Sequence, residues 1–479
     1  MKNIVLLITD TYRYDNLGDR AERPVRSPAL DRFIAERATE IHGSYVGSFP
    51  TIPHRTDVAT GVCGWPHYGW QAIDLSGPNH IAAMLGEQGY STQLLCDCPH
   101  LFRARFNEKF DAAFQNRGQE ADRPILHLND PIETVVPDEK TRTRPRFKDN
   151  TLVNTHRWVN RYCTSELDMF PAKTGQLTIR WLEENCDAGP FFLWVDFFDP
   201  HEPWDAPEYL VRRYDPEYSG TPMLHPNYGP SSAFTPEELK NLWAHYAAES
   251  EVVDRWLGRV LQKIDDLQLW DDTIVVVTSD HGMSVGEHER TGKSNIHDAD
   301  ERYWPIYPEI GHTPFLIAGG DVPRAKSLDI LVQPMDLLPT VCELAGAEVK
   351  PPKAFDGKSF AGPVLSGKGA HRDCVVSGCC VRAKGDQRPR KAVTPFLVTK
   401  QWGYAPVGPY GRRELYDLTS DPLAAKDVAA ENADAVAEMH GVFLDHLKQH
   451  DASQEFLALW GDAKEGEGSW AIDYPNKTV

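Results

Sequence analysis

Three apolar runs, each followed by polar residues, limit the folds that this chain can adopt. The runs and the polar residues beyond them are Ile4 to Ile8 with Asp10, Phe191 to Phe198 with His201, and Ile274 to Val277 with Asp280 and His281. Short apolar runs of this kind are typical of buried parallel strands, and the last run consists of β-branched residues. Parallel strands end at a common carboxyl edge, where open α/β folds bind ligands. We therefore expect these polar side chains to gather at that edge.

The neighbouring residues Asp280 and His281 are candidate metal ligands. Together they offer a hard oxygen and a borderline nitrogen, a combination that suits a divalent ion such as Mn²⁺ or Zn²⁺. Taken alone, the turn could equally be a capped strand end. Asp10 adds another carboxylate at a strand end, and this addition favours the metal site.

Thr51 lies between Pro50 and Pro53, which precede a polar, helix-compatible segment that contains His54 and Arg55. A hydroxyl in front of a helix is surrounded by unpaired backbone N–H groups, which favour anions. Thr51 is thus either the N-cap of the helix or a nucleophile, and the local sequence favours the cap.

The composition is that of a folded globular protein, with 41% hydrophobic and 25% charged residues. A formal net charge of -20 argues against sequence-independent binding of nucleic acid. A small anionic ester would need a local site with a metal or a few basic residues.

The first apolar run is too short for a signal peptide or a membrane span. Nine cysteines without the spacing of a disulfide scaffold indicate reduced thiols and a cytoplasmic protein.

Strands and helices alternate along most of the chain, which indicates an α/β catalytic domain over residues 1–370. Two further strands are predicted at Ser91 to Cys96 and Phe315 to Ala318. Three helices are also predicted: one begins at Ser27, and the others cover Pro236 to Leu267 and Asp336 to Leu344. The polar stretch 115–165 is interpreted as an insertion or lid, with a solvated loop as the alternative.

Beyond residue 370 the pattern changes to shorter elements, which predict a smaller α+β domain over 371–479. Its predicted elements are strands at Arg390 to Lys400 and Leu415 to Leu418, and a helix from Asn432 to Lys448. The tail from Gly466 is expected either to be loose or to contact a partner, such as a second copy of the chain in a homo-oligomer.

Several motifs resemble, in the same order, those of the sulfatase branch of the alkaline-phosphatase superfamily. They are Asn3 to Arg13, Ser27 to Arg32, Thr51 to Arg55 with Thr60 and Gly61, Thr278 to Gly282 with Gly286, His288 and Lys293, Asp336 to Thr340, and Glu414 to Leu418 with Asp421 and Pro422. The resemblance covers nearly the whole chain. It implies an α/β fold in which helices flank a large mixed, mostly parallel sheet, with a small antiparallel sheet in the C-terminal domain.

The resemblance also implies roles for individual residues. Asp10, Asp280, His281 and the nucleophile Thr51 would bind the metal. Arg55 would orient Thr51, while Lys293 and His201 would contact the transferred group or assist the leaving oxygen. His54 and His312 are assigned to substrate binding.

The donor set favours Mn²⁺ or Zn²⁺ over Ca²⁺. One ion is favoured over two because Lys293 fills part of the space for a second; the alternative second site would use His201, His312 and Asp199.

Three positions depart from the sulfatase pattern. Sulfatases convert a Cys or Ser at the nucleophile position to formylglycine, and Thr51 cannot form that aldehyde. Thr11 lies where many sulfatases have a second Asp, and Asp97 lies near the position at which they have a sulfate-contacting Lys. We therefore expect a metal-dependent hydrolase of phosphate or phosphonate esters with Thr51 as nucleophile. The alternatives are a sulfatase without formylglycine and a non-catalytic relative that binds anions.

Overall fold

The structure is a computed structural model, and it describes most of the chain. The described residues are 1–18, 20–77, 79–119, 122, 129–133, 140–141, 149–294, 300, 302–379 and 393–461. The predicted lid at 115–165 is described only in parts, and the predicted strand 390–400 only from residue 393. The tail beyond residue 461, with its predicted partner contact, lies outside the described residues.

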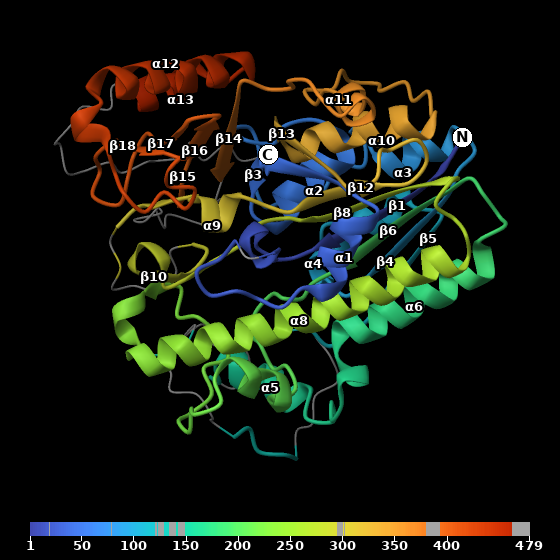
Figure 1. Cartoon of the computed structure of the whole chain (residues 1–479), viewed down its shortest axis with the longest axis horizontal. Coiled ribbons are helices and arrows are strands. Elements are labelled where there is room, and N and C mark those ends of the chain that lie inside the picture. The colour runs from blue at the N-terminus through green and yellow to red at the C-terminus, as the bar shows by residue number, and fades with distance from the viewer. Residues whose placement is uncertain are drawn as a thin grey trace.

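A large mixed sheet forms the centre of the molecule (Figure 1). Its strands in spatial order are β13 (Lys326–Val332), β2 (Thr39–Ser44), β12 (Phe315–Ala318), β8 (Thr273–Ser279), β1 (Asn3–Thr9), β6 (Phe191–Phe197), β4 (Ser91–Cys96) and β5 (Ala112–Gln115). Only β12 runs antiparallel to its neighbours within this sheet. The predicted mostly parallel α/β sheet is confirmed.

Helices cover both faces of this sheet (Figure 1). One layer contains α2 (Thr51–Thr60), α3 (Ile81–Gly86) and α10 (Leu337–Ala345), and the other contains α1 (Pro28–Glu36), α6 (Phe170–Asn185) and α8 (Pro236–Asp266). Side chains of β1 alternate between the two layers, since Ile4 and Leu6 belong to one core and Val5 and Leu7 to the other. Burial on both faces explains why the strand is apolar throughout.

The long helix α8 begins where its sequence predicts. Thr235 is the N-cap and accepts a hydrogen bond from the backbone N–H of Glu238, whose side chain bonds back to Thr235 N. This capping box satisfies two N–H groups at the helix start.

A second sheet lies at the C-terminal end of the chain. Its order is β18 (Glu414–Asp417), β17 (Trp402–Ala405), β16 (Phe396–Thr399), β14 (Cys374–Cys379) and β3 (Ser48–Phe49). Four strands pair antiparallel, and helix α12 (Ala433–Gln449) shares a core with them. Strand β3 comes from the N-terminal part and pairs parallel with β14. Because β3 directly precedes α2, the C-terminal sheet supports the segment that carries Thr51. The division of domains at residue 370 stays a prediction.

Among the described helices, none combines the length and apolar character needed to cross a bilayer. Among the described cysteines, free thiols are found at Cys63, Cys96, Cys98, Cys163, Cys186, Cys342 and Cys374.

Candidate functional site

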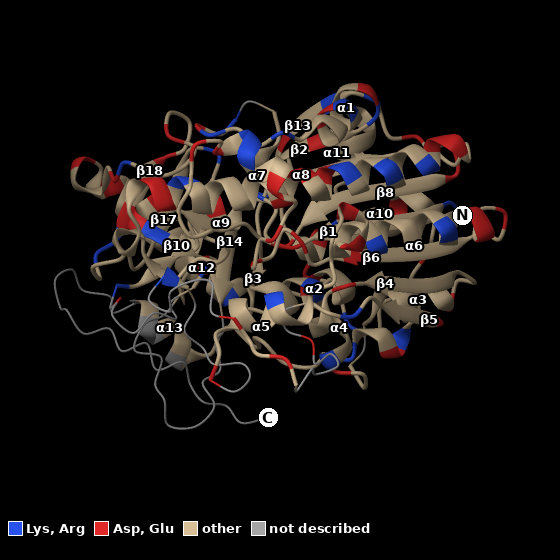
Figure 2. Cartoon of the chain, turned by 90° about the horizontal axis from the view of Figure 1, so that it is seen from below, with Lys and Arg blue, Asp and Glu red and all other residues tan. Residues whose placement is uncertain are grey.

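The ends of the two central strands bring Asp10, Asp280 and His281 together. Strands β1 and β8 are parallel neighbours in register, with Thr9 opposite Ser279, so the residues that follow them meet at the same edge. All three side chains are fully buried. Each offers a ligand atom within 4.8 Å of the other two, and within the described ranges no other His, Cys, Asp and Glu side chains form such a group. Figure 2 shows acidic segments close to the labels of β1 and β6.

The free atoms of this cluster fit a divalent metal. His281 Nδ1 lies 2.9 Å from the carbonyl of Gly282, so that nitrogen carries the proton and Nε2 keeps its lone pair. Nε2 lies 3.4 Å from Asp280 Oδ2 and 3.8 Å from Asp10 Oδ1. Neither His281 Nε2 nor Asp10 Oδ1 has a hydrogen-bond partner among the described residues. Two buried acceptors aimed at a common point would be costly without a cation.

The charge states also suit a cation. Burial, reinforced by the charge of Asp280, raises the pKa of Asp10 well above its ordinary value. Although burial opposes ionisation of Asp280, Arg55 and the neighbouring histidines lower its pKa below the usual range. Burial lowers the pKa of His281 to about 3, which keeps the ring neutral. A bound divalent ion would favour the ionised form of Asp10 and accept the His281 lone pair.

Thr51 is the first residue of helix α2, which makes its predicted role as N-cap wrong. The N-cap position belongs to Pro50, and no side chain caps the helix. Thr51 is buried, with 2% of its surface exposed, and it shares one helix face with His54 and Arg55 at spacings of three and four residues. Nine of the ten residues of α2 are buried, including several polar ones. Polar side chains are seldom buried in such number for packing alone, so we infer that their burial serves the site.

Arg55 is held by three carboxylates and by the helix itself. Its Nε and Nη2 donate to both oxygens of Asp196, at 3.1 and 2.9 Å. Its Nη1 donates to Asp280 Oδ2, to Asp10 Oδ2 at 3.3 Å and to the Thr51 carbonyl at 3.4 Å. The guanidinium thus links the segment of Thr51 to the ends of β1, β6 and β8. A planar, always charged group is suited to such bridging.

Asp196 was missed by the sequence reasoning. It lies inside the apolar run that forms β6 and is fully buried. The available signal was a carboxylate near the end of an otherwise apolar strand, since Asp is almost never fully buried without a partner.

Lys293 lies next to the cluster and contacts a second acidic residue. Its Nζ lies 3.7 Å from Asp10 Oδ1 and 3.7 Å from Glu202 Oε2. His201 lies beside them, and its Nδ1 is 2.6 Å from the carbonyl of Glu202. Burial, with the nearby charge of Lys293, lowers the pKa of His201 well below its ordinary value. The ring is therefore neutral, with the proton on Nδ1 and a lone pair on Nε2.

His54 is buried on the same helix face as Thr51. Burial lowers its pKa to about 3, and the charge of Asp280 acts in the opposite direction. Its Nδ1 has no hydrogen-bond partner within the part of the chain that the structure describes. His54 is therefore a neutral group with one free ring nitrogen near Asp280.

The other two departures from the sulfatase pattern take part in local bonding. The backbone N–H of Thr11 donates to Asp280 Oδ1 at 3.1 Å, and Thr11 has a left-handed backbone with φ of 61°. Such a conformation is strained for a β-branched residue. Asp97 accepts hydrogen bonds from the Thr174 hydroxyl and the backbone N–H of Phe198. Its carboxylate therefore holds the end of β6.

His312 lies in a different environment from the other predicted site residues. Its ring is stacked between Tyr14 and Tyr45, with centroids 3.7 and 4.4 Å away, and Nε2 lies 2.6 Å from the His42 carbonyl. It lines a cavity of about 230 Å³ between strand β2 and the C-terminal sheet. These contacts hold the ring among its neighbours, and substrate binding by His312 stays a prediction.

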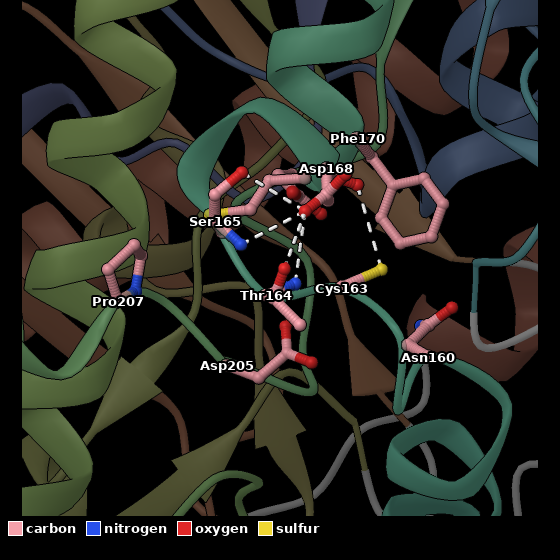
Figure 3. Close-up of a pocket in the computed structure, with 10 residues that line it drawn as sticks. Asn160, Cys163, Thr164, Ser165, Asp168, Phe170, Asp205 and Pro207 are labelled. Carbon is pink, nitrogen blue, oxygen red and sulfur yellow. Dashed lines mark hydrogen bonds between the residues drawn. The ribbon is translucent and has the colours of Figure 1, made fainter.

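Asp199, a ligand in the alternative two-metal site, lines a separate pocket of about 120 Å³ with Asp205. Figure 3 shows this pocket, with Asp168 bonded to Thr164 and Ser165 on one side and Asp205 on the other. Asp199 accepts a hydrogen bond from Gln119 there. His312 and Asp199 thus have their described contacts in two different pockets.

Comparisons with known proteins identify the family to which the chain belongs. The sulfatase family model matches residues 2–347. Arylsulfatase K of Rattus norvegicus is 24% identical over 475 residues, which cover 90% of this chain and 75% of that protein. The arylsulfatase of Clostridium perfringens is 22% identical over 446 residues and covers 88% of both.

Among solved structures, the phosphonate monoester hydrolase of Agrobacterium radiobacter superposes with a TM-score of 0.71 at 20% identity. That match covers 94% of this chain and 96% of that one and supports the alkaline-phosphatase-like fold. Since the family model spans most of the sequence, the chain belongs to the sulfatase family and is an ester hydrolase.

Proposed function

We propose that the chain hydrolyses small phosphate or phosphonate esters with Thr51 as the nucleophile. The observation that carries the proposal is an unmodified threonine at the first position of α2, joined through Arg55 to the Asp10 and Asp280 carboxylates. A hydroxyl in this place can form a covalent intermediate with the transferred group.

The chemistry of threonine favours phosphorus over sulfur. A formylglycine hydrate can expel sulfate by elimination, but a sulfated threonine could only be released by attack at sulfur. A phospho-threonine can instead be displaced in line by water.

Each residue of the site would have a separate role in the reaction. Asp10, Asp280 and His281, with Thr51, would hold a divalent ion, which would lower the pKa of the Thr51 hydroxyl and neutralise charge on the phosphoryl oxygens. Arg55 would fix the start of α2 and thereby aim the Thr51 oxygen. The ammonium of Lys293 would donate a hydrogen bond to the transferred group. His201, neutral with a lone pair on Nε2, is suited to accept a proton from the attacking water.

Hydrolysis of sulfate esters is the second candidate. It is supported by the similarity to proteins named arylsulfatases over about nine tenths of this chain. In this case Thr51 would act without conversion to formylglycine. Retention of the polar groups Asp10, Asp280, His281, Arg55 and Lys293 argues against a non-catalytic role.

A panel of aryl esters separates the candidates. The chain is stripped with a chelator, reloaded with Mn²⁺ or Zn²⁺, and assayed with nitrophenyl esters of phosphate, phosphate diester, phenylphosphonate and sulfate. We expect at least one phosphorus ester to be turned over much faster than the sulfate. Faster turnover of the sulfate would contradict the proposal and support the second candidate.

Metal identity and location are further parts of the proposal. The mixed oxygen and nitrogen donors support Mn²⁺ or Zn²⁺ over Ca²⁺, which prefers oxygen ligands alone. The free thiols of the described part support a cytoplasmic location.

A further inference from the structure

Glu202 is a buried carboxylate next to Lys293, and it has no role in the reaction proposed above. It follows His201, and its side chain has no exposed surface. Its Oε2 lies 3.7 Å from the ammonium of Lys293, and its Oε1 accepts a hydrogen bond from the Tyr228 hydroxyl. A fully buried carboxylate is costly unless its charge is used.

The ammonium of Lys293 lies at equal distances from two carboxylates. Its Nζ is 3.7 Å from Asp10 Oδ1 and 3.7 Å from Glu202 Oε2. Neither distance is that of a close ion pair with direct hydrogen bonds, which would be below about 3 Å. The balance keeps the ammonium from closing on Asp10. Without the charge of Glu202, Asp10 would be the stronger attraction for Lys293.

The position of Glu202 is itself held by the backbone next to Lys293. Tyr228 precedes β7 (Gly229–Pro230), which pairs with β10 (Arg290–Gly292), and Lys293 follows β10 directly. At Gly292, φ is 107°, and a Cβ atom there would lie 2.8 Å from Cδ1 of Tyr228. The close approach requires glycine, and it fixes Tyr228 relative to Lys293.

We propose that Glu202 is a positioning residue that holds Lys293 away from Asp10, with Tyr228 fixing the carboxylate. This arrangement leaves Asp10 Oδ1 free for the metal and directs the Lys293 ammonium toward the transferred group. The inference rests on the proposed function, in which Asp10 is a metal ligand. It differs from a purely structural role because a structural role predicts a loss of stability without a change in metal affinity.

The test uses Glu202→Gln in the full chain, with the affinity for Mn²⁺ and the steady-state kinetics as separate readouts. Gln keeps an oxygen for the Tyr228 hydroxyl but removes the charge. We expect Lys293 to move onto Asp10, the Kd for Mn²⁺ to rise about tenfold and kcat to fall about 10- to 100-fold, the range seen when groups around metal ligands are changed. The KM should change less than about threefold, since the binding groups are retained.

Two further variants keep the inference falsifiable. Tyr228→Phe leaves the charge of Glu202 in place, so it should shift Kd and kcat in the same direction by a smaller factor. In a Lys293→Met background, Glu202→Gln should leave the Mn²⁺ affinity unchanged, because no ammonium remains to occupy Asp10. An equal weakening in that background would mean that Glu202 acts through long-range charge, and the inference would be wrong.

Parent-like Mn²⁺ affinity and kcat in folded Glu202→Gln would also overturn it. If none of the esters is hydrolysed, the proposed function fails, but the Mn²⁺ affinities of the parent and its variants still test Glu202. Should Glu202→Gln not fold, an unchanged Kd and kcat in Tyr228→Phe would count against the inference.

Discussion

The two halves of the site are built in different ways. Asp10, Asp280 and His281 directly follow strands, and Arg55 braces the two carboxylates against Asp196. Lys293, by contrast, follows the short strand β10, beside Glu202 on a turn after β6. The register of the sheet positions the first half, whereas local contacts such as that of Tyr228 position the second. We infer that the half proposed to hold the metal tolerates little change, and that the half proposed to face the leaving group can vary with the substrate.

The largest expected effect is on Thr51, the proposed nucleophile, whose backbone carbonyl Arg55 contacts. Thr51→Ala should lower kcat at least about a thousandfold, because no hydroxyl remains to attack the ester. The melting temperature should stay close to that of the parent. The matched control is Thr51→Ser, which keeps the hydroxyl and should retain most of the activity. Turnover of Thr51→Ala near the parent rate would show that water attacks directly.

A smaller effect is expected from Asp196, which holds Arg55 next to the proposed metal ligands. Asp196→Asn removes the charged bidentate partner of Arg55 at a fully buried position, so the free energy of unfolding should fall by about 3 kcal/mol. Urea unfolding followed by circular dichroism measures this loss.

Asp321→Asn is the control, since Asp321 pairs with Lys2 at the surface, where an ion pair contributes about 0–1 kcal/mol. Equal losses in the two variants would refute the view that the first half depends on its buried brace.

The smallest effect concerns the second half, where His288 links the segment before Lys293 to Ala424 in the C-terminal part of the chain. Its Nδ1 lies 2.9 Å from Glu309 Oε1, and its Nε2 lies 2.9 Å from the Ala424 carbonyl. Although burial disfavours the charged ring, Glu309 raises the pKa of His288 to about 9.

A folded-state pKa above the unfolded value of about 6.5 stabilises the protein fully below that value. The stabilisation is then lost as the pH rises through about 9. The melting temperature of the parent should therefore fall by several degrees more between pH 7 and pH 10 than that of His288→Gln. Parallel curves for the two proteins would contradict this assignment.

Much of the fold follows from local sequence. The strand Ser91 to Cys96 and the helix from Pro236 agree with the predicted bounds to within a residue, because apolar runs, prolines and caps act over a few positions. The N-cap prediction at Thr51 failed for a local reason as well, since Pro50 occupies that position. The pairing of β3 with β14 could not be predicted, because two-residue strands have no periodicity to read.

The sequence alone determined which candidate metal ligands follow the strands, and that a threonine occupies the position of the family's nucleophile. Both depend only on residue type and on the order of elements. The tertiary structure decided that Asp196 holds Arg55, that Glu202 faces Lys293, and that the His312 ring is stacked between two tyrosines. These partners are separated by up to hundreds of residues, and their contacts follow from strand order and close packing, which no local pattern encodes.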